Sequence, residues 1–269
     1  MSNQETKTVE PVTAWVRGVW RRNSMHEESG LIDDTTQVFW VQTPTLFADF
    51  RIPADRPDTA GKTSLADYDD NELLQLAHQE GFAGSLRVDG QICRWQRSID
   101  YQPVQPWLDE AAMFREGDKL IEIGIHDNYL ENYTLVDDGD SRFLALNCPE
   151  DRRPLVVIGS RFLFARDRTL DLPDGAELTY LVAEAEPEKK RALLDCEFSL
   201  GQGLDGDDSW RINLSTLPFR EGQPLFVASS WRFDLNDGHA IEATDVGTRV
   251  WTVHTCTMNQ RELSRLFPS

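Results

Sequence analysis

The sequence predicts an all-β protein made of two consecutive antiparallel β-barrels, with one helix inserted in the first barrel and a short C-terminal helix. Three observations favour this class. Residues 37–53 form two arms rich in aromatic and β-branched residues, joined by Thr43-Pro44-Thr45, as in a tight hairpin. Short strand-like segments bounded by turn residues recur in both halves. Helical periodicity is convincing in one segment of the first half.

The predicted hairpin at residues 37–53 organises the rest of the chain. Val38 and Trp40 share one face of its first arm, whereas Phe39 and Val41 share the other. Neither arm has a wholly polar face, so we expect both faces to be covered. This is the situation of a strand pair whose inner face fills a barrel and whose outer face meets another element.

The other elements of the first half follow from their local patterns. Residues 1–12 are expected to be a disordered tail, residues 14–22 the first strand, and Asp67 or Asp69 the cap of a helix that ends near residue 79. Further strands are predicted at residues 82–88, 91–101, 119–126, 129–136 and 142–147. About eight or nine strands in this length suit a small closed barrel.

The second half repeats the order of elements without a repeat at the residue level. The segment 147–154 is predicted as the junction, which gives a first barrel at 13–149 and a second at 150–269. Strands are predicted at residues 155–165, 177–185, 190–200, 209–215, 224–233, 240–244 and 248–257. A short helix at 259–266 is expected to end the chain.

The charge and cysteine content exclude several classes of function. The chain has 269 residues, with 46 acidic and 27 basic residues and a net charge of −19, which disfavours nucleic acid and anionic membranes as partners. The four cysteines are far apart and are expected to be free thiols in a reducing compartment. The polar N-terminus and the absence of a long apolar run predict a cytoplasmic protein.

No metal or cofactor motif is present in the sequence. The five histidines are scattered, so we expect no metal site, and no cofactor is predicted. The sequence contains no nucleophile elbow and no catalytic-cysteine signature. It therefore leaves open whether the protein is an enzyme, and a homodimer is compatible with it.

Two arginines lie on strand faces with apolar or aromatic neighbours. Arg97 shares a face with Cys93, Trp95 and Tyr101, where an unpaired guanidinium would cost several kcal/mol. It needs a carboxylate partner, a bound anion, or a position at the barrel mouth, and the ion pair is favoured. Arg51 has Asp49 on its own face, so an ion pair between them is the simpler interpretation and a ligand anchor the alternative.

The segment 120–126, LIEIGIH, places three isoleucines on one face and Glu122 and His126 on the other. If the isoleucines fill the core, Glu122 and His126 face water, and this simpler interpretation is favoured. If the isoleucines pack outward, Glu122 and His126 point into a pocket with Tyr133 and the tryptophans. Alternation alone does not reveal the inner side of a barrel.

Five ordered motifs lie within about residues 15–135: GVWRR, DDTTQVFWVQ…LFADFRIP, LLQLAHQEGFAG, CRWQRSIDYQP and LIEIG…YLENY. In these motifs the first half resembles a little-characterised fungal and bacterial family of two-barrel, lipocalin-like proteins. The resemblance implies two consecutive lipocalin-like barrels, with a helix inserted in the first. It implies little about activity, because the family has no agreed enzymatic role.

Three hypotheses of function follow. The leading one is a cytoplasmic protein that binds a small apolar or aromatic molecule with an acidic group in the first barrel. Its predicted ligand-binding residues are Trp40, Arg51, Trp95, Arg97 and Tyr133. The second is a cofactor-free lyase, isomerase or cyclase with Glu122 or His126 as general base. The third is an interaction module with no pocket.

Overall fold

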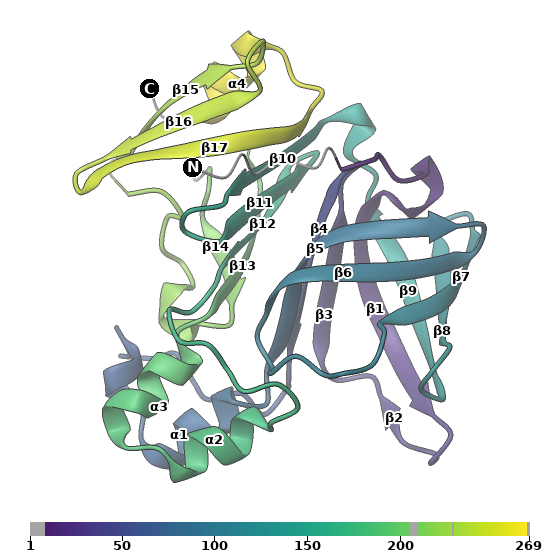
Figure 1. Cartoon of the computed structure of the whole chain (residues 1–269), viewed down its shortest axis with the longest axis vertical. Coiled ribbons are helices and arrows are strands. Elements are labelled where there is room, and N and C mark those ends of the chain that lie inside the picture. Colours follow the sequence, from purple (N-terminus) through teal and green to yellow (C-terminus); the bar gives the residue numbers. More distant parts are fainter. Residues whose placement is uncertain (1–8, 205–208, 228, 268–269) are drawn as a thin grey trace, which may run out of the picture.

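The first half of the chain folds as a closed antiparallel barrel (Figure 1). The computed structural model describes residues 9–204, 209–227 and 229–267. A sheet of order β2-β1-β3-β4-β5-β6-β7-β8-β9 is closed by pairing of β1 with β9, and the two-residue β2 extends its rim. Its strands are β1 (Gly18–Glu27), β2 (Ile32–Asp33), β3 (Gln37–Gln42), β4 (Leu46–Ile52), β5 (Glu80–Asp89), β6 (Ile92–Asp100), β7 (Glu110–Glu116), β8 (Lys119–Gly124) and β9 (Tyr129–Asp137).

The second half forms a separate antiparallel sheet in the order β14-β13-β12-β11-β10-β17-β16-β15. Its end strands β14 and β15 are not paired with each other in the part of the chain that the structure describes. Closure of this half as a barrel therefore stays a prediction. The strands are β10 (Phe143–Cys148), β11 (Arg153–Ile158), β12 (Arg161–Arg166), β13 (Glu197–Gln202), β14 (Ile212–Ser215), β15 (Ser230–Asp234), β16 (His239–Thr244) and β17 (Gly247–Cys256).

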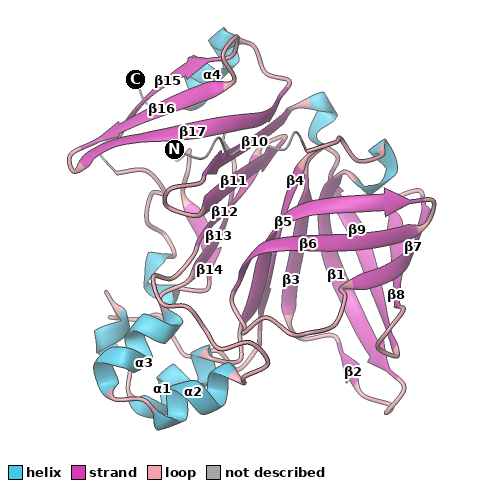
Figure 2. Ribbon diagram, in the orientation of Figure 1, coloured by secondary structure: helices cyan, strands magenta, loops and turns pink. Residues whose placement is uncertain are grey.

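Three short helices gather at one end of the molecule, and a fourth packs on the second sheet (Figure 2). The predicted inserted helix is α1 (Asp70–Leu76), which begins with a capping box between Asp69 and Glu72. The C-terminal helix is α4 (Gln260–Leu266), and its Leu263 and Leu266 join the core of the second sheet. No helix in the described ranges is long and apolar enough to cross a membrane.

The strand predictions at residues 177–185 and 190–200 are wrong over most of their length. The first segment is the helix α2 (Leu178–Glu184), and α3 (Pro187–Leu194) precedes β13. Leu178, Tyr180 and Val182 look like strand alternation. In the helix, however, Leu178 and Val182 are buried at a spacing of four, whereas Tyr180 is 64% exposed. The start of the next helix, α3, is marked by Pro187, because proline is favoured in the first turn of a helix.

The strand at residues 143–148, assigned from the sequence to the first barrel, belongs to the second sheet. It is β10, and it pairs with β11 and β17. The two sheets are therefore joined by the segment after Asp137, ahead of the junction predicted at 147–154. Residues 1–8 of the predicted tail lie outside the described residues, whereas Val12 is buried and its N–H donates to the Pro44 carbonyl at 2.7 Å.

The hairpin formed by β3 and β4 is covered on both faces, as predicted. Val38, Trp40 and Phe47 belong to the aromatic core inside the barrel. Phe50, on the opposite face, belongs to a second core shared with residues of the second sheet such as Phe198. The outer wall of the barrel thus packs against the second sheet, and the inner wall is free to build a site.

Candidate functional site

A cavity of about 910 Å³ lies within the first barrel and its mouth. Side chains from β3, β4, β6, β8 and β9 form its inner part, and the segments 102–109 and 175–179 contribute to its rim. Trp40, Asp49, Arg51, Trp95, Arg97, Glu122, His126 and Tyr133 all line it. Every side chain that the sequence proposed for the site is therefore brought to one cavity.

The inner wall of the cavity is aromatic. The Trp40 ring lies 6.2 Å from that of Trp95 and 6.5 Å from that of Tyr133, both edge-on. Trp20 stacks behind Trp40 at 6.5 Å. The indole Nε1 of Trp40 is buried and has no hydrogen-bond partner among the described residues. A buried N–H donor normally has a partner, so the cavity has unused hydrogen-bonding capacity at this point.

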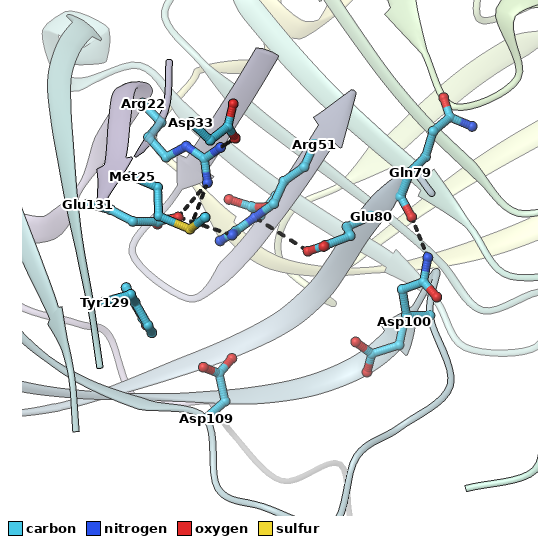
Figure 3. A network of polar contacts seen from close by, with 12 residues as sticks. Arg22, Met25, Asp33, Arg51, Gln79, Glu80, Asp100, Asp109, Tyr129 and Glu131 are labelled. Carbon is cyan, nitrogen blue, oxygen red and sulfur yellow. Dashed lines mark hydrogen bonds and ion pairs between the residues drawn. The ribbon is translucent and has the colours of Figure 1, made fainter. Parts of the chain in front are cut away.

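A network of ion pairs holds Glu131 inside the barrel. Arg22 of β1 donates to Glu131 and to Asp33, and Arg51 of β4 lies 3.2 Å from Glu131 (Figure 3). The Tyr133 hydroxyl donates to the second carboxylate oxygen of Glu131. Burial acts to raise the pKa of Glu131, but Arg51 and Arg22 together lower it below the usual range. Glu131 is therefore an ionised carboxylate with its partners supplied by the protein.

Glu122 points into the barrel, so the favoured interpretation of the segment 120–126 is wrong. Its neighbours Ile121, Ile123 and Ile125 are 39–44% exposed on the outer wall, whereas Glu122 is 5% exposed. The Tyr129 hydroxyl donates to Glu122 Oε1 at 2.8 Å. Burial and the charge of Glu131 raise the pKa of Glu122 to about 8. Glu122 consequently retains its proton at neutral pH in the empty cavity.

Asp49 is the third buried carboxylate of the site. It is 2% exposed and accepts from Arg51 Nε at 3.2 Å, which is the ion pair expected from the sequence. Burial raises its pKa to about 6, although Arg51 acts in the opposite direction. Arg51 is thus shared between Asp49 and Glu131 before any ligand arrives.

Arg97 lies at the mouth of the cavity, where it has the carboxylate partners that the sequence required. It donates to Asp109 at 2.6 Å and to Asp100 at 2.9 Å, and its guanidinium lies 3.8 Å from the ring centre of Phe82. A register shift next to Gly84 leaves Ser98 as an extra residue in β6. This bulge lets Trp95 and Arg97 face the cavity while Ile99 and Tyr101 face the second sheet.

His126 occupies the rim and does not contact Glu122. Its Nε2 lies 3.1 Å from Glu110 Oε2, and the side chain is largely exposed. Glu110 also binds Arg94. The structure therefore separates the two proposed catalytic residues, with Glu122 deep in the cavity and His126 at its edge.

Three members of the site were missed or underused by the sequence argument. Arg22 shares a face with Trp20 at a spacing of two, so its inward direction follows once Trp20 is placed inside the barrel. Tyr129 and Glu131 share a face with Tyr133; Glu131 pairs with Glu122 across β8 and β9, and the Tyr129 hydroxyl donates to Glu122. Their alternation was visible, but their inner position depends on barrel closure.

The cavity is strongly acidic. Its lining contains the arginines Arg51 and Arg97 and the acidic residues Asp49, Glu80, Asp100, Asp109, Glu110, Glu122, Asp127, Glu131 and Glu177. Within the described part of the chain, no group of three or more His, Cys, Asp or Glu side chains is placed to hold a metal ion. The chemistry available is hydrogen bonding, charge pairing, aromatic contact and proton transfer at Glu122.

Comparison with known proteins identifies a similar fold but no family. No protein-family model matches the chain, and no curated protein matches it. A solved structure that does match is described as uncharacterized protein YLR301w from Saccharomyces cerevisiae. It is similar over 89% of this chain and 98% of that one, with a TM-score of 0.52 and 10% sequence identity. The likeness concerns the fold alone.

Proposed function

We propose that the protein binds a small, largely apolar or aromatic molecule in the cavity of the first barrel. The observation that carries this proposal is a cavity of about 910 Å³ with aromatic walls and a few buried polar groups. Ligand sites of proteins typically have about 300–1,000 Å³ and this mixture of lining groups. An interaction module with two solid barrels would not need such a cavity.

The first barrel is proposed to be lipocalin-like. Closed barrels of about eight strands are wide enough to hold one small ligand, and lipocalins use them in this way. The pairing of β1 with β9 and the sequence motifs of the first half support the assignment. We extend it to the second sheet as a proposal, in line with the resemblance.

A cytoplasmic location is proposed on the state of the cysteines. All four are free thiols, three of them buried, and burial raises the pKa of Cys93 to about 12. Such thiols are neutral and unreactive at neutral pH. They suit a reducing compartment, where no disulfide is required for stability.

A second candidate function is proton-transfer catalysis in the same cavity. Glu122 and Glu131 are paired across neighbouring strands, and their environments shift the two pKa values in opposite directions. Such a separation is typical of an acid and a base in one active site. Glu122 is the proton-transferring group in this hypothesis, because Glu131 is engaged by two arginines and a tyrosine.

The first experiment is to denature the purified protein and search the supernatant for a stoichiometric small molecule by mass spectrometry. If the protein is empty, calorimetric titration with indole, a neutral planar probe, follows. We expect Trp95→Ala to weaken indole binding and Ile123→Ala, on the outer face of β8, to leave it unchanged. A protein that releases no compound and binds no aromatic probe would contradict the proposed function.

A further inference from the structure

We propose that the ligand of the first barrel carries a protonated amine on an aromatic body, and that the Glu122 carboxylate binds this ammonium group within walls formed by Trp40, Trp95 and Tyr133. The inference rests on the proposed function and adds the chemical class of its ligand. It reverses the charge predicted from the sequence, which was an acid anchored by an arginine.

The cavity contains more buried carboxyl groups than cations that face them, which favours a cationic ligand. Asp49, Glu122 and Glu131 are at most 5% exposed, and the cations that face them are Arg22 and Arg51. Both arginines contact Glu131, and Arg51 also contacts Asp49. Glu122 has the Tyr129 hydroxyl as its hydrogen-bond partner among the described residues, and no ion pair joins it to a cation there. Glu122 is therefore the buried carboxyl group of the cavity that has no cationic partner among the described residues.

Both arginines that line the cavity are already paired with carboxylates of the protein. Arg51 is held by Asp49, Glu131 and, at 4.0 Å, Glu80. Arg97 is held by Asp100 and Asp109. An acidic ligand would have to compete with these carboxylates, two of which, Asp49 and Glu131, are buried and would be left with a weaker partner. A cationic ligand displaces nothing.

The aromatic wall of the cavity also favours a cationic ligand. The rings of Trp40, Trp95 and Tyr133 form one cluster, and all three line the cavity that Glu122 enters. Tryptophan and tyrosine faces attract ammonium groups through their π-electrons, and more strongly where water is excluded. The unpartnered Trp40 Nε1 is a hydrogen-bond donor, so it would pair with an acceptor atom elsewhere on the ligand and not with the ammonium group.

Acidic side chains at the rim of the cavity add to the preference for cations, because their charges act at a longer distance. Asp100, Asp109, Glu110, Asp127 and Glu177 line the outer part of the cavity. A cleft lined by one sign of charge raises the local concentration of ligands with the opposite sign. Organic cations are consequently drawn to the mouth, and organic anions are repelled.

Binding of an amine is coupled to release of the Glu122 proton. The charged and titratable groups around Glu122 are Arg51 on β4, Cys93 on β6, Asp109 ahead of β7, and Tyr129, Glu131 and Tyr133 on β9. Burial and Glu131 raise the pKa of Glu122, so the empty site holds a neutral carboxyl group at pH 7. An alkylammonium group, with a pKa near 10, ionises it. Amine affinity therefore rises with pH, by up to about tenfold per pH unit, until Glu122 is ionised in the free protein.

The test is calorimetric titration of the full chain with three probes that share one ring system: tryptamine, indole and indole-3-acetate. We expect tryptamine to bind at least about tenfold more tightly than indole, and indole-3-acetate more weakly than indole. Glu122→Gln should reduce tryptamine affinity to about that of indole. Glu116→Gln, the same substitution at an exposed position of β7 outside the cavity lining, should leave all three affinities unchanged.

The outcomes separate this inference from the proposed function. Tightest binding of indole-3-acetate, or a Glu122→Gln variant that keeps its preference for tryptamine, would overturn the inference and leave the binding function standing. Failure of all three probes on a protein that releases no compound would overturn the binding function itself. Glu122→Asp keeps a carboxyl group at this position. A tryptamine preference retained in this variant therefore supports the proposal even if Glu122→Gln folds poorly.

Discussion

At the level of single residues, two neighbouring glutamates inside the barrel have different partners. Glu131 receives two guanidinium groups and a tyrosine hydroxyl, whereas Glu122 receives one tyrosine hydroxyl. The first is an ionised carboxylate that is fully paired, and the second is a neutral carboxyl group with one hydrogen-bond partner. This difference separates the residue that holds the barrel wall from the residue that we propose as the ligand contact.

The raised pKa of Glu122 predicts a pH dependence of stability. A carboxyl group whose pKa rises from about 4.5 to about 8 on folding contributes stability that is complete below pH 4.5 and is lost as the pH rises through 8. Relative to Glu122→Gln, the wild-type protein should therefore lose up to about 1.4 kcal/mol of unfolding free energy per pH unit in this window. Urea denaturation at pH 5 to 9 measures the difference, and a constant difference would contradict the raised pKa.

Removal of the Glu131 charge should be far more damaging. Glu131→Gln leaves Arg22 without a fully buried counterion, and Arg51 with Asp49 as its remaining close partner. Breaking a buried ion pair by removing one partner typically costs about 3–5 kcal/mol. Urea denaturation should show a loss of this size, well above that of Glu122→Gln at pH 7. Equal effects of the two substitutions would show that the two carboxylates do not differ in role.

At the level of elements, the bulge in β6 turns one strand toward two different cores. The bulge requires close contact with β5, because a Cβ on Gly84 would lie 2.0 Å from the carbonyl oxygen of Gln96. Gly84→Ala should therefore destabilise the protein by clearly more than Gly90→Ala. Gly90 lies in an open turn, where the cost comes from its positive φ and is about 1 kcal/mol. Thermal denaturation of the two variants provides the comparison, and equal losses would contradict the close contact.

The sequence correctly predicted the elements whose turns and buried faces can be recognised from neighbouring residues alone. The hairpin at 37–53 and the helix capped by Asp69 were predicted because both their turns and their buried faces are local properties. The inner face of β8 could not be predicted, because its isoleucines look like core residues but lie on the outer wall. Only closure of the barrel, a pairing of the first strand β1 with the last strand β9, decides which face is inside.

The same limit applies to the candidate site. Trp40, Trp95, Arg97 and Tyr133 were predicted to line it because aromatic and charged residues shared strand faces, and all four do. An ion pair of Arg51 with Asp49 and a carboxylate partner for Arg97 were expected from the sequence, whereas the second partner of Arg51, Glu131, lies on the distant strand β9. Charge pairing between distant strands is invisible to alternation, so the sequence did not show how fully the arginines of the site are paired.

At the level of the whole molecule, the two sheets share one core. The outer face of β3 and β4 packs with β11 and β12, and Phe198 of β13 fits over Gly81 of β5. Phe198→Ala should therefore lower the unfolding free energy by about 3–5 kcal/mol. We expect one cooperative transition, at the same urea concentration by tryptophan fluorescence and by circular dichroism. Two separate transitions would show that the halves unfold independently.

A crystal structure of the tryptamine complex tests whether Glu122 binds the amine of an aromatic ligand inside the first barrel. We expect the indole ring to lie against Trp40 and Trp95, with the ammonium nitrogen within hydrogen-bond distance of Glu122 and the Arg51 and Arg97 ion pairs unchanged. Tryptamine bound elsewhere, or with its amine directed away from Glu122, would contradict it.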